Sequence, residues 1–209
     1  MTKVHPNATA AATDRLISSA ADGNGQAVLT VWQKSLLFNC NGFTVFDAKG
    51  NLVFRVDNYV AGNRGEILLM DAAGKPLLTI RRKRLSFGEN WLVFDGETAV
   101  NPRFSARKHV NLLNSKCLAH VSSGVNNGSP GNKNVTYEIE GSYAQRCCAV
   151  YDDKRRCVAE IKRKEAVGGA AFGVDVFRLI VQPEMETAVA MSLVLLLDQM
   201  FGSSRRFSP

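Results

Sequence analysis

The chain has 209 residues, of which 45% are hydrophobic and 22% are charged, a balance that is ordinary for a globular protein. Its net charge of +7 favours anionic partners such as nucleic acid or anionic lipid, without choosing between them. Five scattered cysteines with no C-x-x-C spacing argue against a disulfide framework and favour a reducing compartment. The histidines, His5, His109 and His120, are also scattered, so we expect no metal site and no cofactor.

The two ends of the chain differ in composition from the rest. Residues 1–26 are rich in Ala, Ser and Thr and contain no apolar run, so they do not resemble a secretory signal. We expect a disordered N-terminal tail over 1–26, with a transit peptide as the alternative, then one domain over 27–202 and a short tail over 203–209. Within the domain, the Gly/Asn/Ser-rich residues 122–134 predict a long loop.

An internal repeat predicts β-hairpins. "FTVFDAKGNLVFRV" (43–56) aligns with "ILLMDAAGKPLLTI" (67–80) without a gap, and "CAVYDDKRRCVAEI" (148–161) has the same shape with Arg155 in place of the glycine. Each copy has an apolar strand, an Asp-containing turn and a second apolar strand. Asp hydrogen-bonds its own turn and Gly supplies a positive φ. Similar short runs elsewhere predict roughly 10 to 12 strands in all.

The segment "ETAVAMSLVLLLDQMF" (186–201) is the main helix candidate. Pro183 suits its first turn and Gly202 suits its end. The uncharged part, 188–197, has ten residues, or about 15 Å of helix, whereas a bilayer core is about 30 Å thick. A buried helix is therefore favoured, and a tail anchor is the alternative.

This helix is apolar on all sides, whereas a helix that lies on one face of a sheet shows a polar stripe. Only the predicted strands are available to surround it. We therefore predict a mainly β (α+β) fold in which a closed antiparallel β-barrel wraps around the hydrophobic C-terminal helix.

Two blocks, "LTVWQKSLLFNCNGFTVFDAKGNLVFRVDNY" (29–59) and "DAAGKPLLTIRRKRLSFGENWLVFDGE" (71–97), resemble the signature blocks of the plant LURP-one-related family. That family belongs to the tubby C-terminal-like superfamily, with phospholipid scramblases as more distant relatives. The resemblance covers nearly all of 27–201 and implies a barrel of about twelve strands threaded by a hydrophobic helix.

The resemblance says less about function. At least one family member is linked to plant defence. Tubby domains bind phosphoinositides through Lys and Arg on the barrel surface, which tethers a regulatory protein to the plasma membrane. The tubby lipid-binding motif does not match this sequence residue by residue, so its ligands are not carried over.

No catalytic motif is visible. Gly-rich phosphate loops, G-x-S-x-G and H-E-x-x-H are all missing from the sequence, and no histidine is placed to activate a Ser or Cys nucleophile. Glu138 and Glu140 share one face of a predicted strand, which favours a solvated face over an acid–base pair. We therefore expect no catalytic residues and a protein that is not an enzyme.

Basic residues cluster in the repeats. "IRRKR" (80–84) follows one hairpin, "IKRK" (161–164) follows another, and "DKRR" (153–156) lies in the turn of the latter. Each cation near an anionic leaflet contributes about 1 kcal/mol, and two basic hairpin ends could form one anionic site. The alternative is that these are solvated strand ends that discourage aggregation. The candidate lipid ligands are Arg81, Arg82, Lys83, Arg84, Lys154, Arg155, Arg156, Lys162, Arg163 and Lys164.

These residues and the resemblance together predict a membrane-tethered signalling or defence-related protein that binds phosphoinositide or another anionic phospholipid. The alternatives are a scaffold for an unknown protein partner and, less favoured, a nucleic-acid-associated factor. We expect a monomer that is cytoplasmic, peripheral at the plasma membrane or nuclear, and neither secreted nor spanning a membrane by a helix. The strand aromatics, including Trp32 and Trp91, are expected in the core.

Overall fold

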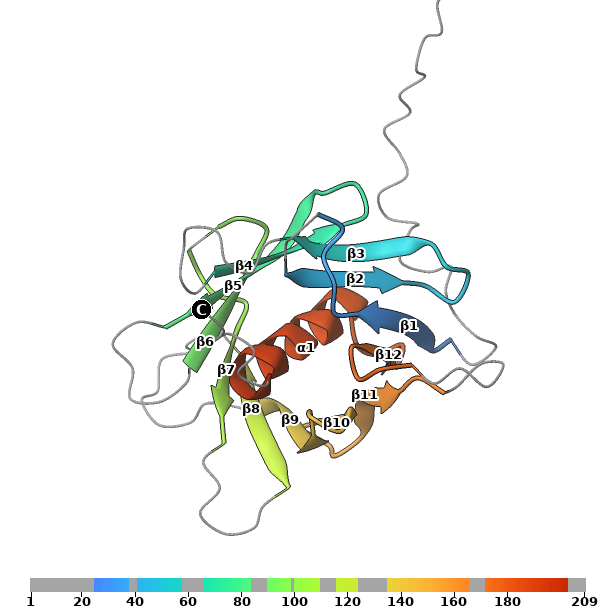
Figure 1. Ribbon diagram of the computed structural model, residues 1–209. Helices are drawn as coiled ribbons and strands as arrows, with labels where there is room; N and C mark the ends of the chain where they lie inside the picture. The colour runs from blue at the N-terminus through green and yellow to red at the C-terminus, as the bar shows by residue number, and fades with distance from the viewer. Residues whose placement is uncertain are drawn as a thin grey trace, which may run out of the picture.

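A computed structural model describes residues 25–37, 41–57, 66–83, 90–98, 100–109, 116–123, 135–165 and 172–202. These residues form twelve β-strands and one α-helix, α1 (Thr187–Phe201) (Figure 1). The strands are β1 (Ala27–Trp32), β2 (Gly42–Phe46), β3 (Leu52–Asp57), β4 (Glu66–Asp71), β5 (Pro76–Arg82), β6 (Asn90–Asp95), β7 (Phe104–Lys108), β8 (Cys117–Ser123), β9 (Val135–Ser142), β10 (Cys147–Asp152), β11 (Cys157–Arg163) and β12 (Val176–Val181).

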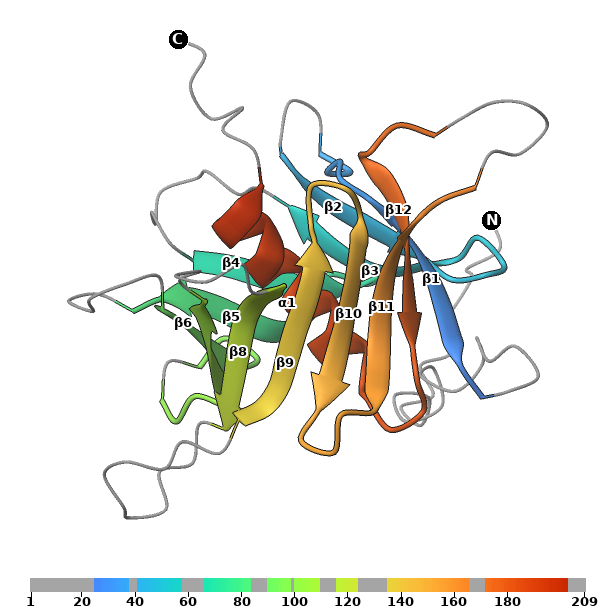
Figure 2. The ribbon, with the colours of Figure 1, turned by 90° about the horizontal axis from the view of Figure 1, so that it is seen from below.

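The strands close into one antiparallel barrel. Each strand pairs with its neighbours in the sequence, and β1 pairs with β12 to complete the ring. Closure therefore leaves none of the described strands with a free edge. Figure 1 shows α1 with strands on all sides, and Figure 2 shows it passing behind β8 to β11. The predicted fold, a closed barrel around a hydrophobic helix, is confirmed.

The turns of the repeat explain its sequence pattern. In the β2–β3 turn, Asp47 Oδ1 accepts two backbone N–H groups at 2.8 Å each, and in the β10–β11 turn Asp152 Oδ1 accepts two at 3.0 and 2.8 Å. Gly50 and Gly74 have φ values of 84° and 89°, and Arg155 at the corresponding place has a φ of 61°. Arg155 thus adopts the left-handed conformation that glycine supplies in the other two hairpins.

Helix α1 supplies the centre of the core. Its buried residues include Leu195 and Leu197, which are both 0% exposed. The one polar side chain in its middle, Ser192, donates its hydroxyl to the Val189 carbonyl at 2.6 Å, so it needs no partner from the barrel. None of the helices in the described residues is long and apolar enough to cross a membrane.

The helix begins later than predicted. Pro183 lies in a turn closed by a hydrogen bond from the Met185 N–H to the Gln182 carbonyl, 3.0 Å, and the first helical residue is Thr187. The chain must reverse direction after β12 before it enters the barrel, and the fixed φ of proline suits that reversal. Gly202 follows the last helical residue as predicted, but its φ of −59° is not left-handed.

Parts of the predicted loop and tails lie outside the described residues. Ser122 and Ser123 end strand β8, and the rest of the predicted loop, 124–134, is not described. The same holds for most of the predicted N-terminal tail, 1–24, and for the C-terminal tail, 203–209.

Candidate functional site

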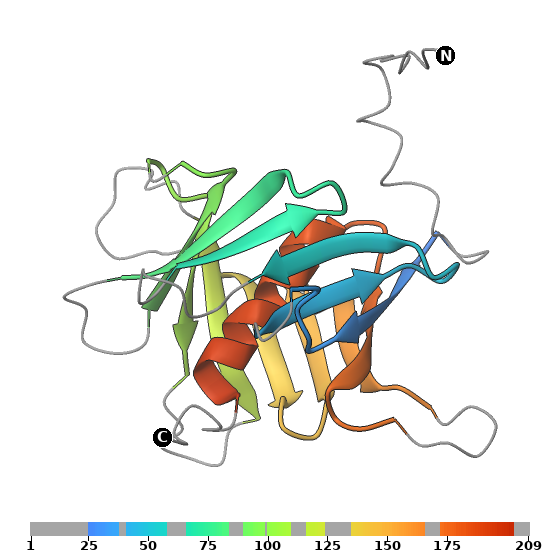
Figure 3. The same cartoon turned by 45° about the horizontal axis from the view of Figure 1, so that its top comes forward.

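The two ends of the barrel are set by the direction of its strands. All pairings are antiparallel around the ring, so odd-numbered strands run one way and even-numbered strands the other. Helix α1 follows β12, enters where the even strands end, and leaves where the odd strands end. There Lys108, the last residue of β7, donates from Nζ to the Met200 carbonyl at 2.9 Å. We call this the exit end and the other the entry end; Figure 3 shows the C-terminal end of α1 and the β9–β10 turn at the exit end.

The predicted basic ligands do not gather in one place. Strands β5 and β11 are six strands apart in either direction around the barrel. Residues 81–83 at the end of β5 therefore lie across the exit end from residues 162–164 at the end of β11. Residues 154–156 lie in the β10–β11 turn at the entry end, and Arg84 lies outside the described residues. No single small anion can contact both strand ends at once.

Several of these cations are already paired with carboxylates. Arg155, for example, reaches from its turn to two carboxylates of β9, so the predicted solvated face of that strand is an ion-paired one. The other described candidates, Arg82, Lys83, Lys154, Arg163 and Lys164, form no ion pair with a described carboxylate. The pairs are Arg81–Glu66 (2.9 Å), Arg155–Glu138 (2.9 Å), Arg155–Glu140 (2.8 Å), Arg156–Asp152 (2.7 Å) and Lys162–Glu160 (3.0 Å).

Exposed apolar side chains gather at the exit end, beside the end of β11. Val100 is the one large exposed apolar residue of the described chain that lies elsewhere. The others lie at and just after the end of β1 or just before β12, and β1, β12 and β11 are neighbours in the barrel. Contiguous exposed apolar surface marks interaction sites more often than isolated residues do. These residues are Trp32, Leu36, Leu37, Phe172 and Val174.

The expectation that Trp32 packs in the core is wrong. Trp32 is 38% exposed, whereas Val31 beside it is 0% exposed. Successive side chains of a strand point to opposite faces, so the inward position of Val31 turns Trp32 outward. Trp91, by contrast, is buried as expected.

Lysines border the exposed apolar residues. Lys34 Nζ lies 5.1 Å from the ring centre of Trp32, and Lys164 Nζ lies 5.1 Å from that of Phe172, both within cation–π distance. Lys164 Nζ also donates to Thr30 Oγ1 at 3.2 Å. We call this surface the exit rim, which consists of Trp32, Lys34, Leu36, Leu37, Arg163, Lys164, Phe172 and Val174.

A buried polar network fixes the segments that carry the exit rim. Asp198 of α1 accepts hydrogen bonds from Gln33 Nε2 at 2.9 Å and from the Tyr143 hydroxyl at 3.2 Å. Arg146 donates to Gln33 Oε1 at 2.9 Å and to the Val174 carbonyl at 2.8 Å. Burial raises the pKa of Tyr143, so its hydroxyl keeps the proton that it donates. The network joins the end of β1, the start of β12 and the helix.

A basic hollow lies next to the exit rim. It has a volume of about 520 Å³ and is lined by Gln145, Arg146, Cys147, Lys162 and Arg163. Arg163 Nε donates to the Gln145 carbonyl at 3.0 Å, which holds that guanidinium at the wall. The described lining contains cations and no carboxylate, so the hollow favours an anion.

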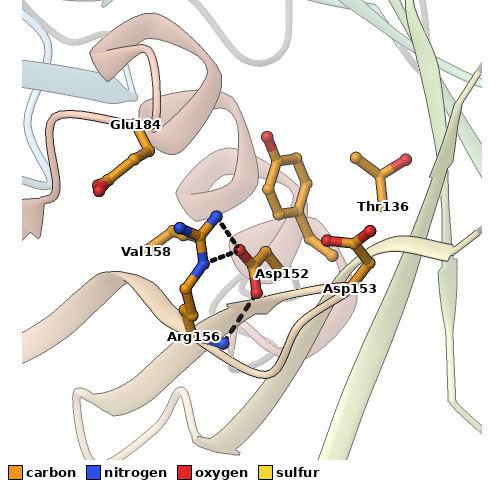
Figure 4. Close-up of a pocket in the computed structure, with 7 residues that line it drawn as sticks. Thr136, Asp152, Asp153, Arg156, Val158 and Glu184 are labelled. Carbon is orange, nitrogen blue, oxygen red and sulfur yellow. Dashed lines mark hydrogen bonds and ion pairs between the residues drawn. The ribbon is translucent and has the colours of Figure 1, made fainter.

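A second pocket, of about 310 Å³, lies at the entry end, and its lining is acidic where that of the basic hollow is cationic. Its one cation, Arg156, is turned onto Asp152, with Nε–H and backbone N–H donating at 2.7 and 2.8 Å (Figure 4). The further carboxylates in its wall would repel an anion. The lining residues are Thr136, Tyr137, Asp152, Asp153, Arg156, Val158 and Glu184.

Two histidines and a cysteine converge on the outside of β7 and β8. His109 Nδ1 lies 3.1 Å from His120 Nε2, and Cys117 Sγ lies 3.5 Å from the same nitrogen. Although the histidines are scattered along the sequence, the fold brings His109 and His120 into contact. Burial and a hydrogen bond with Glu138 raise the pKa of the Cys117 thiol to about 12.

A β-bulge explains why sequence reasoning missed this cluster. In a regular strand, residues three apart such as Cys117 and His120 point to opposite faces. Here Cys117 pairs with Glu140 and the next pair is Ala119 with Ile139, so Leu118 is the extra residue. The bulge brings Cys117 to the outer face that His120 occupies. The C-x-x-H spacing was the one available signal.

Comparison with known proteins identifies the family. The model of the LURP-one-related family matches residues 27–198. Protein LURP-one-related 8 of Arabidopsis thaliana is 56% identical over 208 residues, covering 98% of this chain and 100% of the relative. Protein LURP-one-related 17 of the same plant is 42% identical over 215 residues, covering 95% of each.

A solved structure agrees in fold. The X-ray structure of a protein from Arabidopsis thaliana superposes with a TM-score of 0.62 at 24% identity, over 83% of this chain and 90% of that one. This likeness supports the barrel architecture alone. With the family model spanning nearly all of the barrel, the chain belongs to the LURP-one-related family.

Proposed function

We propose that this protein is a non-enzymatic, membrane-binding factor that docks its exit rim on an anionic lipid surface. The observation that carries the proposal is the meeting of exposed Trp, Phe and aliphatic side chains with cations that form no ion pair in the described chain. Aromatic and aliphatic side chains enter the boundary between headgroups and acyl chains, and neighbouring Lys and Arg bind the phosphates. A role in signalling or defence would follow from reversible recruitment.

The expected binding is weak enough to be reversible. Lys34, Arg163 and Lys164 together contribute about 3 kcal/mol at about 1 kcal/mol each. Removing one large apolar side chain fully from water contributes about 1.5 to 3 kcal/mol, and the half-exposed residues of the exit rim contribute less. The charge component falls as salt screens it, whereas the apolar component does not.

The positions of the two basic strand ends favour a flat partner. Because β5 and β11 run in the same direction, Arg82 and Lys83 lie at the exit end as well, on the far side from Arg163 and Lys164. A planar bilayer surface can contact both sides of a ring at once, whereas one soluble headgroup cannot. The basic hollow lined by Lys162 and Arg163 would take one headgroup phosphate within that larger contact.

Vesicle sedimentation tests the proposal with a matched charge change at each end of the barrel. Wild-type protein should sediment with phosphatidylcholine vesicles that contain phosphatidylserine or a phosphoinositide, and less so at high salt. Lys164→Glu at the exit rim should reduce binding several-fold. Lys154→Glu, which makes the same change in the entry-end turn, should bind as wild type does.

Fluorescence tests whether the apolar side chains enter the bilayer. The chain has two tryptophans, so the variant Trp91→Phe leaves Trp32 as the only reporter. Its emission should shift to the blue when anionic vesicles are added. No sedimentation at low salt, or equal loss in the Lys154→Glu and Lys164→Glu variants, would overturn the proposal and favour the alternative of a protein-interaction scaffold.

A further inference from the structure

We propose that His109, Cys117 and His120 form a zinc site on the outer face of the barrel. Two imidazole nitrogens and one sulfur form a compact group of donor atoms, all within 4.8 Å of one another. The residues come from the end of β7 and the start of β8, so the sheet already holds their backbones in place. This inference does not depend on membrane binding.

The donor separations agree with tetrahedral zinc. Zinc bonds of about 2.0 to 2.1 Å to nitrogen and about 2.3 Å to sulfur place two nitrogens about 3.3 Å apart and a nitrogen about 3.5 Å from a sulfur. The observed separations are 3.1 Å from His109 Nδ1 to His120 Nε2 and 3.5 Å from Cys117 Sγ to His120 Nε2. The His109–Cys117 edge is the one that has to shorten when a metal binds.

The chemistry of the donor set selects the metal. Imidazole and thiolate suit zinc and other borderline or soft ions, whereas calcium and magnesium require oxygen ligands. Three protein ligands leave one position of the tetrahedron for water or another ligand, the arrangement found in open zinc sites. On binding, the metal replaces the proton of the Cys117 thiol, and that proton passes to the buffer.

The surroundings of the cluster support a cation. Glu138 is the cross-strand partner of His120 and hydrogen-bonds with Cys117, so a carboxylate lies directly beside the proposed ligands. Arg155 fixes that carboxylate at 2.9 Å, as outer partners do in known sites.

The backbone presents the ligands before any metal arrives. The His109 N–H donates to the Leu118 carbonyl at 2.8 Å, which fixes the end of β7 against the bulge of β8. The two rings meet edge to face, with centroids 5.1 Å apart and planes at 75°. Because Lys108 beside His109 holds the Met200 carbonyl of α1, a bound metal would stiffen the exit end where the helix leaves.

Cobalt(II) substitution gives a direct readout of this site. The full-length chain, free of any histidine tag and stripped with a chelator, is titrated with Co²⁺ under reducing conditions. We expect one cobalt per chain, visible bands of tetrahedral intensity, and a thiolate-to-cobalt charge-transfer band in the near ultraviolet. Added Zn²⁺ should displace the cobalt and raise the midpoint of thermal unfolding.

Matched variants separate loss of ligands from loss of fold. Cys117→Ser should abolish the charge-transfer band, and His120→Gln should weaken metal binding at least tenfold. Cys157→Ser, which removes a half-buried cysteine of strand β11, should leave both unchanged. The metal-free variants should have the circular dichroism spectrum of the metal-free wild type. No band in the wild type, or an undiminished band in Cys117→Ser, would overturn the proposal.

Discussion

Replacing Leu195 by Asp tests the central claim of the fold, that α1 lies inside the barrel. Leu195 sits in the middle of the helix and is 0% exposed. It belongs to the hydrophobic core that α1 forms with the inner faces of the strands. An aspartate there would have neither water nor a described cation to stabilise its charge.

The size of the effect follows from two contributions. Losing a fully buried leucine costs about 1.5 to 3 kcal/mol. Full burial raises the pKa of a carboxyl by about 3 to 5 pH units, so an interior aspartate takes up a proton at pH 7. Because pH 7 lies about 3 units above the ordinary aspartate pKa, and each unit corresponds to about 1.4 kcal/mol, this protonation costs about 4 kcal/mol. The expected loss of about 6 to 7 kcal/mol is comparable to the whole stability of a typical domain, about 5 to 15 kcal/mol.

Urea unfolding followed by circular dichroism measures this loss. Leu195→Asp should be largely unfolded at pH 7. Leu195→Asn, which adds polarity without a charge, should lose less, and the two variants should converge as the pH falls toward about 4, where the carboxyl is protonated. Leu36→Asp on the exposed exit rim should change stability by less than about 0.5 kcal/mol. A Leu195→Asp variant as stable as wild type would refute the interior helix.

Two further predictions concern a glycine of strand β9 and a carboxylate of the β2–β3 turn. Gly141 has a φ of 114° and an added Cβ would collide with the Cys147 carbonyl, so Gly141→Ala should cost more than the roughly 1 to 2 kcal/mol of left-handed strain alone. Gly50→Ala, with a φ of 84° and open space around it, should cost only that strain, and equal urea midpoints for the two variants would contradict this. The hydrogen bond from the Asn51 side chain lowers the pKa of Asp47 from 3.8, so Asp47 stabilises the fold above pH 3.8 and less below it. The stability difference between wild type and Asp47→Ala should therefore shrink in acid, and a constant difference in a pH series would count against this assignment.

The fold could be predicted because its causes are local or simple. The Asp and Gly of each repeat turn reveal the hairpins since both residue types act on their own turn. Even the exceptional Arg155 was placed correctly, because alignment of the repeats does not need every turn residue to match. The interior helix followed from its length and from the lack of a polar stripe.

The features of the candidate sites depend on which strands are neighbours in the barrel, and the sequence of one segment does not show that. The basic ends of β5 and β11 occupy equivalent places in the repeat, but ring closure sets them on opposite sides. Trp32 was misplaced because a strand rich in apolar residues does not show which face is inward. The His–Cys cluster needs both the β7–β8 pairing and the bulge at Leu118. The spacing of the residues along the sequence predicts neither of them.

Helix α1, which fills the barrel, is also the last described element of the chain to be synthesised. The strands leave the ribosome with their inner apolar faces uncovered, because the residues that will cover them have not yet been made. Completion of the barrel therefore waits until α1 has been made, and nascent chains with uncovered strands must be protected from aggregation until then. A product that stops before Thr187 would contain every strand of the barrel and nothing for them to close around.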